Sequence, residues 1–236
     1  MKYKQSPLDR FLQQRISDNA KELKTVLNET LQTEQDCLEQ ILFSINHCKK
    51  NIAACEKQIE KCNLKSLPAY ESRKSAFKEN LIIWNMMGHI QMASIEMKEC
   101  LKRLSTEDID DWEQRDMIKS AYITIYETSK KLVDSTAEII KFINHYFPSF
   151  DCEAFKLTRK ELTTFRENNT AELTRVRNSI AAHRDEEVST QIEMIEGLHL
   201  SDTVELIIEY GNIVNKLGSV TNPIIELGIK RLQKSW

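Results

Sequence analysis

The sequence predicts an all-α protein, a helical bundle whose long N-terminal helices pair antiparallel in the manner of a coiled coil. Three observations predict this fold class. The 236 residues include only five Gly and four Pro, fewer than the many turns of a β-rich fold require. Apolar residues recur at alternating steps of three and four, as they do on one face of a helix. Outside residues 188–200, no segment shows the apolar–polar alternation of a β-strand.

The first helix is predicted from about Leu8 to Cys62, a stretch without Gly or Pro. Its apolar positions follow a heptad repeat that Glu34 alone interrupts. This heptad seam consists of Leu27, Leu31, Leu38, Ile41, Ile45, Cys48, Ile52, Cys55, Ile59 and Cys62. A straight helix of about 55 residues spans roughly 80 Å. We therefore expect it to protrude, to break or to pack along a partner.

The six cysteines are predicted to be reduced, because no secretory signal precedes them. Cys48, Cys55 and Cys62 are seven residues apart, which places them about 10 Å from each other along a helix. That spacing is too wide for one tetrahedral metal ion with sulfur ligands at about 2.3 Å. We interpret the three as small apolar core residues, and the sequence predicts neither a metal nor a cofactor.

Proline and capping residues predict the next two helices. Residues 63–68 form a break, since Pro68 cannot continue a helix, and a second helix follows over 69–104. Residues 105–108 offer an N-cap and acidic first-turn residues for a third helix. Pro148 ends that helix.

A fourth helical region is predicted over residues 151–183. An interruption is expected near 167–170, because Asn169 and Glu172 resemble a capping box. The region carries an apolar stripe of Phe155, Leu162, Phe165, Asn169, Leu173, Val176, Ile180 and His183.

The C-terminal part is predicted to contain one loop and two helices. Residues 188–200 are interpreted as the loop. A helix over 202–217 ends at Gly218. A last short helix has Pro223 at its first position.

Two regions follow from this order of elements, a long helical hairpin over residues 1–104 and a helical bundle over 105–236. A single continuous domain is the alternative. The net charge of −3 argues against a strongly basic, non-specific nucleic-acid binder and leaves room for a local basic patch. No stretch approaches the roughly 18 apolar residues of a membrane helix. We expect a cytoplasmic protein that does not associate with membranes.

The segment from 177 to 183 carries the chemistry that the sequence offers. It combines a fixed cation, Arg177, with the amide of Asn178, the hydroxyl of Ser179 and the imidazole of His183. A histidine near pKa 6.5 can transfer protons at neutral pH, and an arginine fork can hold a phosphate. This set suits metal-independent cleavage of RNA. The chain has no Gly-rich phosphate loop and no Cys-x-x-Cys, His-Glu-x-x-His or Gly-x-Ser-x-Gly motif.

Arg177 and His183 do not converge on a straight helix. Six residues separate them by about 120° in azimuth and about 9 Å in rise. Contact with one phosphate therefore requires the reach of the arginine side chain, a local kink, or contributions from two subunits.

Arg177-Asn178 followed by Ala182-His183 resembles the Arg-polar-x(3–5)-His motif of HEPN domains, all-helical modules of bacterial toxin–antitoxin and abortive-infection systems. Arg184-Asp185 and the helix start at 198–202 are similar to the abortive-infection branch, so that the resemblance covers roughly residues 170–217. It implies an RNase that acts as a homodimer, with the motifs of two subunits meeting in a cleft.

By this resemblance, Arg177 and His183 would be essential for catalysis and Asn178 would support them. Some members of the family are non-catalytic and bind nucleotides or partner proteins, so an antitoxin or other protein partner is a further expectation. The long N-terminal helices lie outside the motif, which does not explain them.

Two alternatives stay open. In the first, Arg177 pairs with Glu172 or Asp185, and His183 binds the last carbonyls of its helix, which favours cations. In the second, the chain is a non-enzymatic helical interaction module that uses the heptad seam from Leu27 to Cys62.

Overall fold

The computed structural model describes residues 7–105, 110–178 and 188–235, and every described regular element is a helix. The all-α prediction is thus confirmed. The helices are α1 (Pro7–Ile59), α2 (Leu67–Leu104), α3 (Asp111–Tyr146), α4 (Glu153–Val176), α5 (Val188–Glu196) and α6 (Leu200–Gln233).

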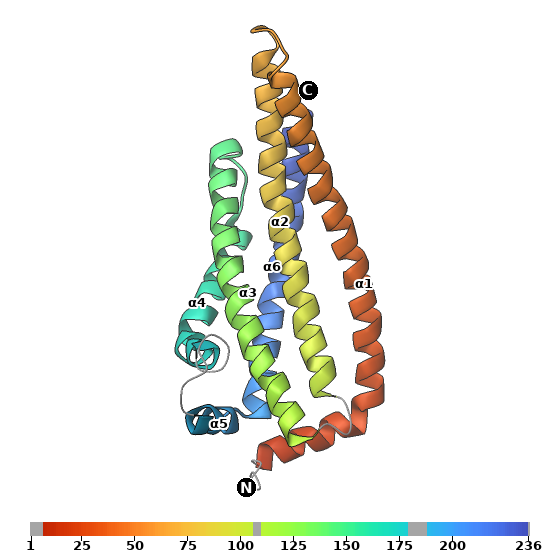
Figure 1. The fold of residues 1–236 in the computed structure, drawn as a ribbon, viewed down its shortest axis with the longest axis vertical. Helices are drawn as coiled ribbons and strands as arrows, with labels where there is room; N and C mark the ends of the chain where they lie inside the picture. The colour runs from red at the N-terminus through yellow and green to blue at the C-terminus, as the bar shows by residue number, and fades with distance from the viewer. Residues whose placement is uncertain (1–6, 106–109, 179–187, 236) are drawn as a thin grey trace.

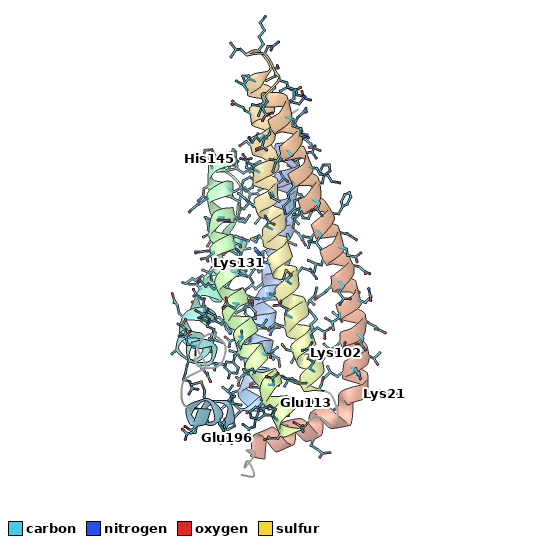
Figure 2. The ribbon with its side chains drawn as sticks, viewed as in Figure 1. Lys21, Lys102, Glu113, Lys131, His145 and Glu196 are labelled. Carbon is cyan, nitrogen blue, oxygen red and sulfur yellow. The ribbon has the colours of Figure 1, made fainter. Side chains whose placement is uncertain are left out.

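Four of these helices, α2, α3, α4 and α6, form an up-and-down bundle in which each helix contacts two antiparallel neighbours (Figure 1). Figure 2 labels Glu113 and His145 at the two ends of α3, which spans most of the length of the bundle. The short α5 lies at the end of the bundle where α6 begins. Helix α1 packs along the outside of α2 and contacts α6 much less.

One continuous hydrophobic core joins the four bundle helices. Ile83 of α2, Ile125 of α3, Leu162 of α4 and Tyr210 of α6 are all fully buried in it. Helix α2 belongs to the predicted N-terminal hairpin region, so this core crosses the boundary drawn at residue 104.

The heptad seam of α1 lies against α2 of the same chain. Its buried members are Leu27, Leu31, Ile41, Ile45, Cys48 and Cys55. The two helices are in contact at Gly88, where an added Cβ would lie at an ordinary contact distance of 3.7 Å from Ile41 Cγ2. Near Lys21, α1 bends and its N-terminal part crosses the end of the bundle (Figure 2). The long helix therefore packs along α2, and the same chain supplies the partner that its length predicts.

The polar residue of the seam is accommodated by α2. Glu34 Oε1 accepts hydrogen bonds from Ser94 Oγ at 2.9 Å and from Lys98 Nζ at 2.5 Å. Gln91 Nε2 donates to the Glu34 carbonyl at 3.1 Å. These bonds fix the register of α1 on α2.

The predicted start of the third helix at residues 105–108 was placed too early. The N-cap of α3 is Asp110, whose Oδ1 accepts from Glu113 N at 2.8 Å. Ser105 instead ends α2, since its hydroxyl donates to Leu101 O at 2.7 Å. Residues 106–109 lie outside the described residues.

The predicted interruption of the fourth helix near 167–170 is wrong. Helix α4 continues through Asn169, whose Nδ2 donates to Phe165 O at 2.8 Å rather than forming a capping box. Leu162, Phe165 and Leu173 keep one buried face along the whole helix.

Two predictions for the C-terminal part are also wrong. Residues 188–196 form a helix, α5, where a loop was expected, and Arg115 of α3 donates to its Ile195 carbonyl at 3.1 Å. Helix α6 continues through both Gly218 and Pro223. Its buried face, with Val214, Leu217, Thr221, Ile224 and Leu227, runs across both residues.

Two further features of the chain, its cysteines and its apolar stretches, can be compared with the sequence-based predictions. All six cysteines are free thiols, as predicted. Among the described residues, no helix is both long enough and apolar enough to cross a membrane.

Candidate functional site

The candidate site lies at the C-terminal end of α4, beside α3. Two hydrogen bonds between side chains of different helices fix the positions of the helices in this part of the bundle. Tyr122 of α3 donates to Glu172 Oε1 of α4 at 3.3 Å. Tyr210 of α6 donates to Thr128 Oγ1 of α3 at 2.8 Å. The end of α4 is therefore held against a fixed surface of α3.

The buried face of α4 determines where Arg177 points. Leu173 and Val176 are buried in the core, as the predicted stripe requires. Arg177 follows Val176 by one residue and so turns about 100° away from that face. Its side chain is 37% exposed. Packing thus leaves the guanidinium at the surface next to α3.

Helix α4 ends at Val176, and its C-cap Arg177 still has helical backbone angles. Arg177 and Asn178 continue the helix as a π-helical turn, a widened turn that is often found at functional sites. The Arg177 N–H points to the carbonyls of both Leu173 and Thr174.

Among the described residues, three groups surround the Arg177 guanidinium. Its Nε lies 3.4 Å from Glu127 Oε1 of α3. Its Nη1 donates to Asn178 Oδ1 at 3.2 Å. Its Cζ lies 5.7 Å from the centroid of the Tyr126 ring, within the range of a cation–π contact. The guanidinium is oriented by an aromatic face, a carboxylate and an amide.

This arrangement brings together two of the three predicted site residues, Arg177 and Asn178. The third, His183, lies outside the described residues, as do Ser179 and Asp185. Convergence of Arg177 with His183 on one phosphate remains a prediction. The expected pairing of Arg177 with Glu172 is wrong, because Glu172 accepts from Tyr122 and Glu127 takes its place beside the guanidinium.

Sequence reasoning missed Tyr126 and Glu127. Both follow Ile125, a member of the buried stripe of α3, and nothing in the local pattern marks them as neighbours of residue 177. They lie 51 and 50 positions from Arg177, and only the packing of α4 on α3 brings them together. An aromatic and an acidic residue beside a predicted buried stripe are too common to serve as a signal.

The electrostatics of the site leave Arg177 able to bind an anion. Glu127 is 54% exposed, and ion pairs at such exposure contribute about 0.2–1 kcal/mol. Burial and the nearby carboxylates of Glu172 and Asp202 raise the pKa of Tyr122. Tyr122 therefore stays a neutral hydrogen-bond donor and anchors α4 without adding charge.

A separate groove of about 470 Å³ lies between α1, α2 and α6. Trp84 and Met87 line it together with polar residues that include Glu34, Gln91 and Asn215. The carboxylate of Glu34, the strongest polar group of the groove, accepts hydrogen bonds from Lys98 and Ser94. It therefore contributes to the packing of α1 on α2. Among the described residues, no group of three or more His, Cys, Asp or Glu side chains is placed to hold a metal ion.

Comparison of the chain with protein-family models, with curated proteins and with solved structures finds no match. The resemblance to HEPN domains therefore rests on the residues of this chain alone. The geometry around Arg177 is the structural basis for any functional argument.

Proposed function

We propose that the chain is a HEPN-like, metal-independent endoribonuclease or RNA-binding protein of a toxin–antitoxin or phage-defence system. The observation that carries the proposal is the surface guanidinium of Arg177, oriented by Tyr126 and bonded to Asn178. It belongs to the Arg-Asn…His motif that ends at His183.

The proposed reaction is an internal transesterification. The 2′-hydroxyl of RNA attacks the adjacent phosphorus, the P–O2′ bond forms and the P–O5′ bond breaks. His183 accepts the proton of the 2′-hydroxyl or donates one to the departing 5′-oxygen. Arg177 holds the phosphate and stabilises the charge on its non-bridging oxygens. The products are a 2′,3′-cyclic phosphate and a 5′-hydroxyl, and DNA, which lacks the nucleophile, is spared.

A homodimer completes the proposed site. Two motifs meeting in one cleft would supply two imidazoles, so that one can accept a proton while the other donates.

The alternative, an interaction module, was based on the heptad seam of α1, and most of this seam is buried within the chain. Helix α2 covers the heptad seam of α1, so a partner could reach Leu31 or Ile45 only by displacing α2. Deleting residues 1–62 would also uncover the apolar face of α2, and loss of binding in that variant would not identify a partner surface.

The test is cleavage of RNA by the purified full-length protein in EDTA. We expect the wild type to cut single-stranded RNA to 2′,3′-cyclic phosphate ends, detected by mass spectrometry, and to leave DNA of the same sequence intact. Arg177→Ala and His183→Ala should abolish cutting. His145→Ala, which changes an exposed histidine at the far end of α3, should cut normally.

The outcomes separate the two forms of the proposal. Cutting that Arg177→Ala and His183→Ala both remove supports the endoribonuclease. Binding of RNA without cutting, weakened by Arg177→Ala, supports the RNA-binding form. If the wild type neither cuts nor binds RNA, the proposal is wrong.

A further inference from the structure

We infer that Glu127 competes with the substrate phosphate for the Arg177 guanidinium, so that the phosphate must displace Glu127 in order to bind. We also infer that Tyr126 holds the guanidinium in place while this exchange occurs. The inference rests on the proposed function, since it assigns a substrate phosphate to Arg177. It adds two residues that the Arg-Asn…His motif does not contain.

The hydrogen-bond geometry of Arg177 is the first step. A guanidinium offers two edges with paired donors, Nε with Nη2 and Nη1 with Nη2, and each can hold two phosphate oxygens. Glu127 lies 3.4 Å from Nε and so engages the first edge. Asn178 accepts from Nη1 and engages the second. The described residues thus occupy one donor on each edge, and bidentate binding of a phosphate requires Glu127 or Asn178 to leave.

Glu127 and Asn178 differ in charge, and this difference decides which of the two limits the binding of a phosphate. Asn178 is neutral, and after rotation its amide can donate to a phosphate oxygen. Glu127 is an acceptor only when ionised, and its negative charge repels the phosphate wherever it moves nearby. Glu127 therefore lowers the affinity of the site for anions, whereas Asn178 can assist it.

Tyr126 explains why displacement of Glu127 would not release the arginine. Its ring is half-buried and packs against the main core, so it offers a fixed surface. The guanidinium lies over that ring at 5.7 Å. A cation–π contact persists when the carboxylate leaves. Tyr126 is thus a positioning residue, which limits the freedom of Arg177 before the phosphate arrives.

A matched pair of variants tests the role of Glu127. Glu127→Gln removes the charge and keeps the shape. Glu161→Gln makes the same charge change in another exposed ion pair, in which Glu161 Oε1 lies 2.5 Å from Lys216 Nζ. We expect Glu127→Gln to bind a short fluorescent single-stranded RNA about two- to fivefold more tightly than the wild type, the range that an exposed ion pair allows. Glu161→Gln should differ from the wild type by less.

Tyr126 is tested by replacing its ring. Tyr126→Leu should lower kcat more than it raises KM, because it loosens a group that acts on the transition state. Tyr126→Phe keeps the aromatic face and should restore both values. A purely structural role would instead lower the melting temperature of the Leu variant and leave the kinetic constants of its folded fraction unchanged.

A second measurement keeps this inference separate from the proposed function. The NMR signal of Arg177 Nε–H reports anion binding directly, and inorganic phosphate serves as the probe. Glu127→Gln should shift this signal at a lower phosphate concentration than the wild type and Glu161→Gln do. If the wild type binds no RNA, the proposed function fails, and the phosphate titration alone decides whether Glu127 restricts access. If Glu127→Gln matches the wild type or Glu161→Gln in both measurements, the inference is overturned.

Discussion

Asn80 of α2 and Gly228 of α6 make a direct side-chain-to-backbone hydrogen bond inside the protein. Asn80 Nδ2 donates to the Gly228 carbonyl at 2.8 Å and to Ala76 O at 3.0 Å. Both Asn80 and Gly228 are buried. A Cβ at position 228 would lie 2.7 Å from Asn80 Oδ1 and 2.8 Å from Ile83 Cδ1. The two helices therefore approach each other at a point where only the absence of a side chain leaves room for the amide.

Gly228→Ala should destabilise the protein. The added methyl group must push the Asn80 amide or Ile83 aside, and overpacking together with a strained buried hydrogen bond costs about 2–3 kcal/mol. Urea unfolding followed by circular dichroism measures this loss. Gly211→Ala, also in α6, is the matched control, because no atom lies within 4 Å of its added Cβ.

In Gly211→Ala we expect no loss, and a gain of up to about 1 kcal/mol, since alanine is the better helix former. Equal stability of Gly228→Ala and the wild type would show that the close approach of α2 and α6 at this point carries no energetic weight.

The contact of Glu34 with Lys98 gives a second prediction. Both side chains are largely buried, and Glu34 Oε2 makes no hydrogen bond to any described residue. Lys98→Met should cost about 1–3 kcal/mol, because it leaves a carboxylate that α1 cannot expose to water. Combining it with Glu34→Leu should recover most of the loss, since an apolar pair continues the heptad seam. A double-mutant cycle in urea measures the coupling, and additive losses would contradict it.

His89 predicts a pH dependence of stability. It lies half-buried between α2 and α3, with Nδ1 3.3 Å from Ser135 Oγ. Burial, assisted by the positive charge of Lys131 and opposed by Glu138, lowers the pKa of His89 below its ordinary 6.5. As the pH falls below that value, the unfolded chain binds a proton that the folded protein does not, so the folded state loses stability.

Replacing His89 by Gln should remove this contribution to the pH dependence of stability. Urea midpoints measured between about pH 7.5 and 5.5 should fall less in His89→Gln than in the wild type. His145→Gln, at an exposed histidine, is the control and should follow the wild type. Parallel curves for all three proteins would contradict the assignment to His89.

The cysteines should differ in their reactivity. Burial raises the pKa of the Cys48 and Cys100 thiols to about 11, and the thiolate is the reactive form. Cys37 is exposed on α1. Iodoacetamide near pH 8 should label Cys37 first and reach Cys48 and Cys100 only when urea unfolds the protein. Peptide mass spectrometry measures the order, and early labelling of Cys48 in the folded state would contradict it.

Local apolar spacing was sufficient to predict the long helices of the first three quarters of the chain and their buried faces. Most of the heptad seam from Leu27 to Cys55 is buried, and the stripe of α4 from Phe155 to Val176 packs into the core. Such patterns are readable because a helix repeats its faces every 3.6 residues whatever it packs against. The residue types also placed Arg177 beside the buried face of α4, where its side chain reaches the surface.

Prediction from the sequence failed where the local conformational preference of a residue opposes the packing of its helix. Gly218 and Pro223 favour a break, with a cost of about 1 and 3 kcal/mol within a helix. The α6 face that continues across them buries large side chains such as Leu217 and Ile224, each contributing about 1.5–3 kcal/mol. The free energy gained by packing α6 on α2 therefore outweighs the cost of keeping Gly218 and Pro223 within the helix. The same balance keeps α4 continuous through Asn169.

The motif at Arg177-Asn178 was found from residue types alone, because a cation, an amide and an imidazole in one segment indicate phosphate chemistry. Its surroundings were decided by the tertiary structure. Tyr126 and Glu127 reach Arg177 only because α4 packs antiparallel on α3. Contacts between residues 50 positions apart depend on how two helices pair and rotate, and helical periodicity within either one carries no information about that pairing.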